Sequence, residues 1–214
     1  MRDFLHLYVF ETDEPVRSRR KALQESLLQE VLKREAGVDA PIRLEKEARG
    51  KPYCADFPDL HFNMSDSGPY TIIAVSDRRV GADVEHIRTR PASALFQRWF
   101  LPEEKPPTPL FAEQETPADF IYLWTCKESL LKYIGCGLGA EMKQHPVLWR
   151  TDPISGKPTP YAFFKGEELA FSSFWMQQAG YILTLCHPKS LCGKITLAAG
   201  LPEITCLFPT GTGR

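Results

Sequence analysis

The stretch Trp124-Thr-Cys-Lys-Glu-Ser-Leu-Leu-Lys132 carries an acid and a base four residues apart, within a segment of helical hydrophobic periodicity. Apolar residues recur around it at intervals of three, four and seven, which predicts one buried helix face made of Phe120, Leu123, Trp124, Leu131 and Ile134. Glu128 and Lys132 lie beside that face, because residues four apart are neighbours on a helix. In isolation the pair fits an exposed ion pair as well as a reactive site.

Both ends of this helix are marked in the sequence. Thr116 is a good N-cap, Pro117 suits the first helical position, and Asp119 stands three residues after Thr116, as in a capping box. Gly135 suits the left-handed conformation in which many helices end. We therefore expect the helix to begin at Pro117 and to end just before Gly135, with the rest of the chain as its scaffold.

Composition and charge describe an ordinary globular chain. Its 214 residues, of which 43% are hydrophobic, can bury one large core or two small ones. A formal net charge of −1 gives no indication of nucleic-acid or membrane binding, and we expect neither. The N-terminal apolar run, Phe4 to Phe10, is too short for a signal peptide or a membrane span. The six cysteines show no C-x-x-C pair and no zinc-ligand spacing, so we expect reduced thiols in a cytoplasmic protein.

Hydrophobic periodicity and turn residues predict the other elements. The first half is expected to hold a helix at Arg17–Ala36, a strand at Leu5–Phe10, and three strands in an antiparallel meander at Leu60–Met64, Tyr70–Ser76 and Val80–Val84. The second half begins with a short helix at Ala92–Phe100 and an extended, proline-rich connector at 102–117. Four strands are expected after the long helix, at Val147–Arg150, Tyr161–Phe164, Leu169–Phe174 and Tyr181–Leu185.

Each half of the chain therefore combines a helix with a small sheet. We expect an α/β (α+β) fold of two similar subdomains with small antiparallel sheets and packed helices, the N-terminal one over residues 1–90 and the C-terminal one over 91–188. Residues 189–214 form a C-terminal extension that we expect to be partly disordered, above all at 211–214. The similar order of elements permits a pseudo-duplicated chain.

A second acidic motif, Gly81-Ala-Asp-Val-Glu85, adds two carboxylates to the Glu128 and Lys132 of the expected long helix. Alternation along a strand puts Asp83 and Glu85 on one face, about 7 Å apart. Two carboxylates this close repel each other unless a cation lies between them, and magnesium is the natural candidate. If Glu128 reaches the same point, three carboxylates and Lys132 converge into a magnesium–phosphate centre, which is poor in histidine and therefore unsuited to zinc. The motif alone also fits an exposed acidic strand end.

Together these motifs resemble the 4′-phosphopantetheinyl transferases of the longer, surfactin-synthetase-activating type. The segment from Gly81 to Glu85 looks like the family's G-[VI]-D-[IV]-E motif, and the segment from Trp124 to Lys132 matches W-x-x-K-E-[AS]-x-x-K. Two further matches precede them in the family's order: Gly50-Lys-Pro-Tyr53, and Phe62-Asn-Met-Ser-Asp-Ser-Gly68 against F-N-x-S-H-[ST]. The resemblance extends over most of the chain, from the first helix to the last expected strand.

This resemblance implies an enzyme that moves the phosphopantetheine arm of coenzyme A onto a serine of an apo acyl, peptidyl or aryl carrier protein and releases 3′,5′-ADP. It implies two α/β halves related by a pseudo-twofold axis, with coenzyme A in the cleft between them. A chain that is already duplicated needs no second copy to complete this cleft, so we expect a monomer. The expected partners are coenzyme A and the carrier protein.

The resemblance also assigns roles by position. Asp83, Glu85 and Glu128 would hold the magnesium ion, Glu128 would act as the general base, and Lys132 would contact the phosphate or protonate the leaving group. Glu104 matches a looser acidic position that assists the metal or the base. Coenzyme A itself would be held by Lys51, Pro52, Ser65, Asp66, Lys132, Arg17 and Arg20, with Lys51 and Pro52 on either side of the adenine.

Two departures from the family pattern affect the coenzyme A site. Asp66 stands where the family has histidine, and an ionised carboxylate cannot donate a hydrogen bond to a phosphate. The N-terminal part looks shorter than in relatives, so the cations that hold the 3′-phosphate there would be replaced by the basic run Arg17, Arg19, Arg20 and Lys21. The same run fits a solvated helix end.

Three functions from different classes stay open on this sequence. The first is the active transferase, and the second is a degenerate relative that binds coenzyme A or carrier protein without turnover, which Asp66 motivates. The third is a different magnesium-dependent enzyme, such as a nucleotide or pyrophosphate hydrolase, although the sequence has no glycine-rich phosphate loop. For the acidic helix of a carrier protein we expect a surface at the connector 102–117 together with Arg88 and Arg90.

Overall fold

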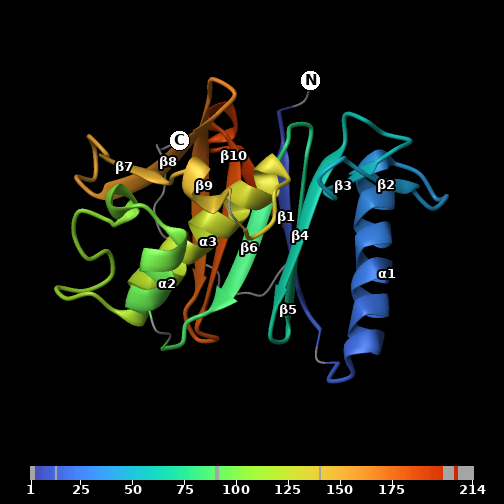
Figure 1. Cartoon of the computed structure of the whole chain (residues 1–214). Helices are drawn as coiled ribbons and strands as arrows, with labels where there is room; N and C mark the ends of the chain where they lie inside the picture. Colours follow the sequence, from blue (N-terminus) through green and yellow to red (C-terminus); the bar gives the residue numbers. More distant parts are fainter. Residues whose placement is uncertain (1–2, 13, 90–91, 140, 200–204, 207–214) are drawn as a thin grey trace.

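The computed structural model describes residues 3–12, 14–89, 92–139, 141–199 and 205–206, and the structural statements below concern these residues. The expected disorder at 211–214 and the predicted contact residue Arg90 lie outside them. The described chain is a mixed α/β fold with several small, mainly antiparallel sheets, as the sequence predicted (Figure 1). It has four layers in the order helix, sheet, sheet, helix. One buried hydrophobic cluster lies between each pair of neighbouring layers.

The first sheet has the strand order β11-β1-β5-β4 and carries α1 (Arg17–Ala36) on one face. Alternation divides β1 between two cores: Tyr8 packs with α1, whereas Leu5, Leu7 and Val9 pack toward the second sheet. All pairs are antiparallel except β1 with β11. The strands are β1 (Leu5–Glu11), β4 (His61–Ser67), β5 (Tyr70–Ser76) and β11 (Ile195–Ala199), next to a separate hairpin of β2 (Leu44–Lys46) and β3 (Pro52–Cys54).

The second sheet has the order β6-β10-β9-β8-β7, with β12 (Thr205–Cys206) paired to β9. One face packs against the first sheet, and the other packs against the long helix α3 (Pro117–Ile134). Shorter helical elements, α2 (Ala92–Trp99), η1 (Pro102–Glu104), η2 (Met142–Gln144) and η3 (Lys189–Leu191), complete the chain. The strands of this sheet are β6 (Gly81–His86), β7 (Leu148–Thr151), β8 (Pro158–Phe164), β9 (Glu167–Met176) and β10 (Tyr181–Pro188).

The predicted meander of three strands is wrong at its third strand. β4 and β5 form a hairpin, as expected, but the other neighbour of β5 is β1, and β6 pairs with β10 in the second sheet. The reason is that Ala82 and Val84 of β6 fill the core between the sheets, so the turn before β6 carries the chain across that core. β11 crosses in the opposite direction to pair with β1. The subdomain boundaries at 90 and 188 and the pseudo-twofold relation stay predictions.

The long helix α3 begins and ends where the sequence predicts. The Asp119 carboxylate accepts hydrogen bonds from the backbone N and from Oγ1 of Thr116, at 2.7 and 2.6 Å. Gly135 ends the helix with φ of 87°. This end is also held by the chain around it, because two cations donate to its last carbonyl groups, as described below.

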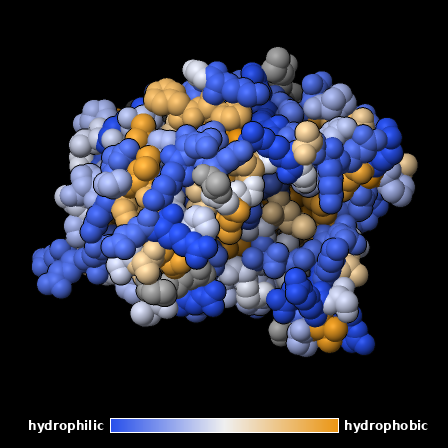
Figure 2. All heavy atoms as spheres, in the orientation of Figure 1, coloured by the Kyte–Doolittle hydropathy of each residue, from blue (hydrophilic) through white to orange (hydrophobic). Residues whose placement is uncertain are grey.

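The apolar face predicted for α3 is narrower than the surface that is buried. The second sheet, α2 and the connector cover nearly every side of the helix, so that Lys127 is fully buried, whereas Glu128 and Lys132 are half-buried. Neither α3 nor any other described helix has the length and apolar character needed to cross a membrane. Figure 2 shows mostly hydrophilic residues on the face seen in Figure 1, with hydrophobic ones in patches between them.

Gly81 is the point at which α3 lies directly on the backbone of β6. A Cβ atom at this position would lie 2.5 Å from the amide nitrogen of Tyr133 and closer still to the carbonyl oxygen of Ser129. Both atoms belong to the helix backbone, so they cannot turn aside as a side chain can. The residue at position 81 must therefore be glycine for the helix to reach the strand.

A buried histidine on β10 lies between the second sheet's strands. Nδ1 of His187 donates to the carbonyl of Pro188 at 2.9 Å, and Nε2 therefore accepts from Oγ of Ser172, also at 2.9 Å. The His187 side chain is fully buried, and this burial lowers the pKa of His187 to about 4. The imidazole is consequently neutral in the folded protein at physiological pH.

Replacing Gly81 by alanine should destabilise the fold by about 3 kcal/mol, because the added Cβ overlaps helix backbone. Gly137→Ala is the matched control, since a Cβ at Gly137 meets nothing within 4 Å, and it should change stability by no more than about 0.5 kcal/mol. Urea unfolding of the two variants measures both values. Equal stability of the two variants would show that α3 does not rest on β6.

The folded protein should lose stability as the pH falls from 6.5 toward 4. The folded pKa of His187 lies below the unfolded value, so below pH 6.5 the unfolded chain binds a proton that the folded chain excludes. This difference amounts to about 3 kcal/mol near pH 4, at about 1.4 kcal/mol per pKa unit. His187→Gln should remove that part of the pH dependence in urea unfolding at pH 7 and pH 4.5, and an unchanged slope would contradict the assignment.

Candidate active site

Residues from three distant parts of the chain meet at the side chain of Lys132. Its Nζ atom donates hydrogen bonds to Oδ1 of Asp83 on β6 and to Oγ of Ser65 on β4, both at 2.7 Å. Ser65 also donates to Oδ1 of Asp83, at 2.9 Å. Since β4 belongs to the first sheet and β6 to the second, this cluster joins both sheets to α3.

A fourth side chain fixes β4 to β6. The backbone N–H of Ala82 donates to Oδ1 of Asn63 at 2.8 Å, and both residues are buried. The bond sets the position of Ser65, two residues along β4, against Asp83. Asn63 was part of a motif in the sequence but received no role there. A buried amide on a strand between apolar neighbours was the signal for this contact.

The Asp83 carboxyl is almost completely buried within this cluster. Only 4% of the residue is exposed, and this burial raises the pKa of the Asp83 carboxyl above its ordinary value, against the effect of the Lys132 ammonium and the Ser65 hydroxyl. Its second oxygen, Oδ2, is buried and has no hydrogen-bond partner among the described residues. An unpaired buried carboxylate oxygen is costly, so this atom is suited to a cation or a donor that arrives with a ligand.

Glu85 and Glu128 are the other two carboxylates that the resemblance assigns to the metal. Glu85 stands two residues after Asp83 on β6, hence on the same face of the strand, as predicted. Glu128 stands on α3 directly before Ser129, whose carbonyl abuts Gly81. Both are half-buried. All three side chains offer carboxylate oxygens, the ligand type that a hard divalent cation prefers. Their binding of one shared ion stays a prediction.

Lys51, which the sequence placed beside an adenine, uses its amine to cap α3. Its Nζ donates to the carbonyl oxygens of Lys132 at 2.6 Å and of Val80 at 2.7 Å. Burial lowers the pKa of Lys51 to about 7. The amine is therefore occupied by the backbone, and contact with an adenine would involve the aliphatic stem of Lys51 and the ring of Pro52. That contact stays a prediction.

Arg79 is a second cation at the end of α3, and the sequence analysis missed it. Its guanidinium forms a two-point ion pair with Glu47, at 2.6 and 2.7 Å, and also donates to the carbonyl groups of Tyr133 and Ile134. Cations are favourable at a helix C-terminus, where carbonyl groups lack partners within the helix. Lys51 and Arg79 thus hold the helix end that carries Lys132.

The structure brings Arg17 and Arg20 together with Asp66. With Lys21 they line a pocket of about 540 Å³ between the start of α1 and β4. Arg20 is held there by the carbonyl oxygens of Glu14, at 2.8 Å, and Gly68, at 3.3 Å. Asp66 is exposed, lines this pocket together with the three cations and a second acid, Glu25, and follows Ser65 directly in the sequence. A role of this pocket in coenzyme A binding stays a prediction.

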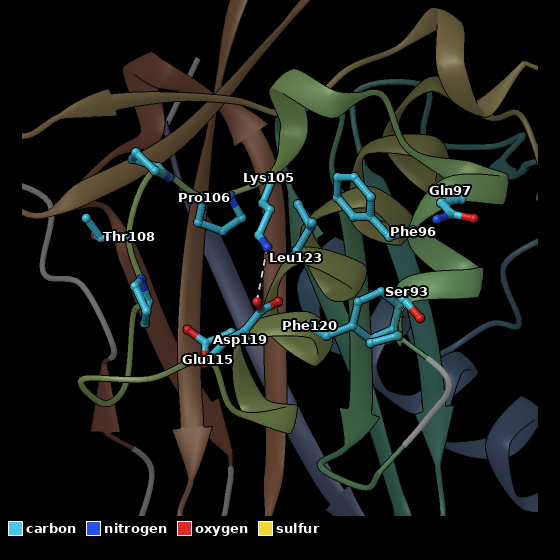
Figure 3. Close-up of a pocket in the computed structure, with 13 residues that line it drawn as sticks. Ser93, Phe96, Gln97, Lys105, Pro106, Thr108, Glu115, Asp119, Phe120 and Leu123 are labelled. Carbon is cyan, nitrogen blue, oxygen red and sulfur yellow. Dashed lines mark hydrogen bonds and ion pairs between the residues drawn. The ribbon is translucent and has the colours of Figure 1, made fainter.

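A further pocket, of about 500 Å³, lies between α2 and the connector (Figure 3). Phe96 of α2 and Phe120 of α3 face the proline-rich segment across it. Lys105 and Glu115 form an ion pair at its edge, at 3.1 Å. Arg88, which is exposed, lines an adjoining cavity of about 260 Å³. The connector is thus irregular after η1, as expected from its prolines, but it encloses apolar surface.

Glu104 lies in a buried ion pair with Lys127, and its expected role in assisting the metal or the base stays a prediction. Its Oε1 accepts from Nζ of Lys127 at 2.6 Å and from the backbone N of Val147 at 2.9 Å, while Oε2 accepts from the backbone N of Leu101 at 2.8 Å. Both side chains of the ion pair are fully buried. Glu104 therefore anchors η1 and the approach to β7 onto α3. The motif from Trp124 to Lys132 contains Lys127, but the sequence assigned no role to it. The signal for its burial was the apolar character of its neighbours on α3, almost all of which are buried.

Removing either member of this buried pair should destabilise the protein by about 3 to 5 kcal/mol, since each leaves the other charge unpaired. The double variant Glu104→Gln with Lys127→Met should cost less than the sum of Glu104→Gln and Lys127→Met. Lys105→Met is the control, because the exposed Lys105–Glu115 pair should contribute less than about 1 kcal/mol. Additive effects in chemical unfolding would contradict the buried pair.

Comparison with known sequences places these contacts in a family. The sequence model of the 4′-phosphopantetheinyl transferase superfamily matches residues 79–186, which include β6, α3 and β10. 4′-Phosphopantetheinyl transferase Sfp of Bacillus subtilis (strain 168) is 31% identical over 137 residues, 63% of this chain and 60% of that protein. 4′-Phosphopantetheinyl transferase HetI of Nostoc sp. is 31% identical over 152 residues, 68% of this chain and 64% of that protein.

The human L-aminoadipate-semialdehyde dehydrogenase-phosphopantetheinyl transferase is also 31% identical, over 116 residues that form 48% of this chain and 38% of that protein. The matched part of the chain thus spans about 60% of the length of Sfp. The family match covers half of the chain and contains Asp83, Glu85, Glu128 and Lys132. The chain belongs to the 4′-phosphopantetheinyl transferase superfamily.

Proposed function

We propose that this protein transfers the 4′-phosphopantetheine arm of coenzyme A to a serine hydroxyl of an apo carrier protein and releases 3′,5′-ADP. The observation that carries this proposal is the hydrogen-bonded cluster of Lys132, Asp83 and Ser65, in which three family motifs meet. The names of the relatives, which describe phosphopantetheinyl transferases, support the same activity.

The proposed metal is Mg²⁺, held by Asp83, Glu85 and Glu128. All three offer oxygen atoms, and the orphaned Oδ2 of Asp83 supports the fit of such an ion. When bound, the ion would neutralise pyrophosphate charge that repels an incoming nucleophile. Its arrival would also relieve the burial cost that raises the pKa of Asp83.

The chain's own residues would bind the phosphates and accept the proton. Lys132 is half-buried and already donates to two oxygens, so its ammonium is positioned to donate to a phosphate oxygen as well. Ser65 holds Lys132 and Asp83 in place. Glu128 would take the proton of the attacking serine hydroxyl as its oxygen bonds to phosphorus and the bond to 3′,5′-ADP breaks. Lys132 would balance the charge on that leaving group.

Coenzyme A would extend from this cluster around β4, the edge strand of the first sheet. The pocket of Arg17, Arg20, Lys21 and Asp66 lies on the other face of β4 from Ser65, and its cations suit the 3′-phosphate. Asp66 cannot donate to a phosphate when ionised, so its place in this pocket is the feature that would weaken binding. A catalytically inactive, coenzyme A-binding relative is the alternative that this residue favours.

The carrier protein would dock at the pocket between α2 and the connector. Its apolar lining, with Phe96 and Phe120, suits the apolar side of a helix, and the exposed Arg88 nearby suits the acidic side (Figure 3). A monomer in the cytoplasm is part of the same proposal, because the described cysteines form no disulfide and the Lys132 cluster is complete within one chain.

The direct test is intact-mass spectrometry of apo carrier proteins incubated with this protein, coenzyme A and Mg²⁺, with and without EDTA. A mass gain equal to the phosphopantetheine arm, lost with EDTA, supports the proposal. Coenzyme A binding without any mass gain across acyl, peptidyl and aryl carriers would support the inactive relative instead. Hydrolysis of coenzyme A or of a nucleotide without a carrier would support a hydrolase.

Glu128→Gln should lower the transfer rate by at least about 100-fold, because the amide can neither take the serine proton nor offer a charged ligand to the metal. The half-buried position of Glu128 predicts a fold of unchanged stability, which thermal unfolding checks. Glu103→Gln, at an exposed acid of η1, is the control and should transfer at the normal rate. Near-normal transfer by Glu128→Gln would contradict the assigned role.

A further inference from the structure

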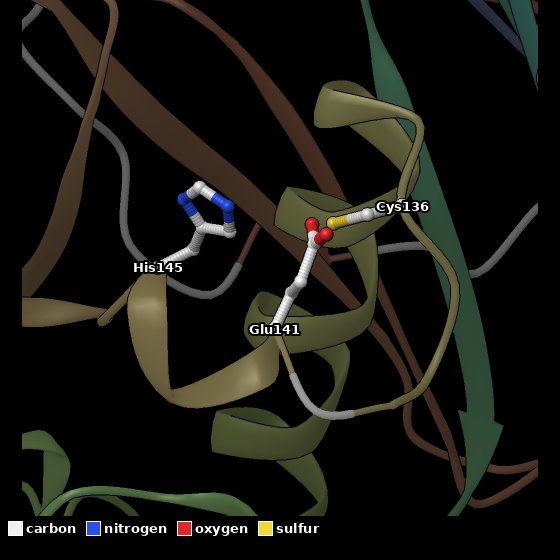
Figure 4. Close-up of side chains that lie close together, drawn as sticks. All are labelled: Cys136, Glu141 and His145. Atoms are coloured by element: carbon white, nitrogen blue, oxygen red, sulfur yellow. The ribbon is translucent and has the colours of Figure 1, made fainter. Parts of the chain in front are cut away.

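A second group of metal-binding side chains lies beyond the C-terminal end of α3. Cys136 stands two residues after the last residue of α3, and Glu141 and His145 flank the short helix η2. One ligand atom from each residue, a sulfur, a carboxylate oxygen and an imidazole nitrogen, lies within 4.8 Å of the other two. Figure 4 shows the Glu141 carboxylate next to the Cys136 sulfur, with the His145 ring facing them.

The donor set differs in kind from that of the Asp83 site. Sulfur and imidazole nitrogen suit zinc and related borderline-soft metals, whereas magnesium requires oxygen ligands. Bonds of about 2.0 to 2.3 Å in a tetrahedron hold ligand atoms roughly 3.3 to 3.8 Å apart. The three ligand atoms lie within 4.8 Å of one another, so their spacing exceeds that of a closed site by no more than about 1.5 Å, a difference that side-chain rotation can remove. We propose that Cys136, Glu141 and His145 bind one zinc-class divalent ion.

Two contacts already hold His145 in place for this task. The buried ammonium of Lys127 donates to the backbone carbonyl of His145 at 2.8 Å. The ring of Phe164 meets the imidazole edge-on, with centroids 6.1 Å apart. Metal affinity depends on such supports, because they orient a ligand before the ion arrives. The position of His145 is thus tied to α3 through the same lysine that pairs with Glu104.

The site is open to solvent on one side. Glu141 and His145 line a pocket of about 700 Å³, while Cys136 is buried, with 9% of its surface exposed, and lies outside the pocket lining. An ion can therefore enter through the pocket, and a water molecule can occupy the fourth position. Arg49 donates to one oxygen of Glu141 at 2.7 Å, which leaves the carboxylate's second oxygen for the ion.

Metal binding at this site is a simple exchange. The thiol of Cys136 gives up its proton to solvent as the sulfur bonds to the ion, and His145 binds in its neutral form. The bound ion would link Cys136, just beyond α3, to Glu141 and His145 on the two sides of η2. The ion should therefore fix the segment that follows Lys132, and it should raise the unfolding temperature of the protein by an amount that grows with the logarithm of the ion concentration over its Kd.

Cobalt(II) titration tests the site through its spectrum, independently of any transferase activity. Metal-free protein is titrated with Co²⁺ in excess Mg²⁺, which occupies oxygen sites but does not compete for a thiolate. One equivalent should produce sulfur-to-cobalt charge-transfer absorption, and Zn²⁺ should abolish it by displacement. Absence of this absorption in the wild-type protein would overturn the proposal.

Three variants identify the ligands. Cys136→Ser should lose the charge-transfer absorption, whereas Cys192→Ser, at a half-buried cysteine after η3, should retain it. His145→Asn should weaken Co²⁺ binding at least about tenfold. Glu141→Gln should also weaken Co²⁺ binding. Because 42% of the Glu141 side chain is exposed, this variant tests the site even if the cysteine variant fails to fold. Charge-transfer absorption that persists in folded Cys136→Ser would overturn the proposal.

Discussion

The close approach of α3 to β6 is the contact on which the rest of the structure depends. Gly81 lets the helix backbone touch the strand, and that distance places Lys132 within 2.7 Å of both Asp83 and Ser65. A larger residue at position 81 would lift the helix and separate the partners of the cluster. Packing and chemistry are therefore one constraint here, because the glycine that permits the helix to dock also sets the geometry of the charged groups.

Charged side chains around α3 satisfy the carbonyl groups at its C-terminal end, whereas the Asp83 carboxylate beside Lys132 keeps one oxygen without a partner. Lys51 and Arg79 satisfy the last carbonyl groups, and the buried pair of Lys127 and Glu104 anchors the opposite side. In the Lys132 cluster, Oδ2 of Asp83 is a buried oxygen without a hydrogen-bond partner among the described residues. Unsatisfied groups of this kind are rare in folded proteins and persist where a ligand completes them. The stability of the surrounding contacts offsets the cost of that oxygen.

Local signals in the sequence predicted where most helices and strands lie, but not which of them pack or pair with each other. The capping residues of α3 predicted its ends, and alternation predicted the shared face of Asp83 and Glu85. Sequence spacing could not show that β6 leaves the meander, because short turns join strands of one sheet or of two. The ion pair of Glu104 was missed for a related reason: its partner Lys127 is 23 residues away and becomes a neighbour only in the fold. The Cys136 cluster has no standard zinc spacing, so folding alone brings it together.

The account's central claim is that coenzyme A binds where Lys132, Ser65 and Asp83 meet. A crystal structure of the protein with coenzyme A and Mg²⁺ tests it most directly. The account predicts that the pyrophosphate contacts Nζ of Lys132 and that the ion lies within bonding distance of Oδ2 of Asp83. Coenzyme A bound in a different pocket, with the Lys132 cluster untouched and Oδ2 still without a partner, would contradict it.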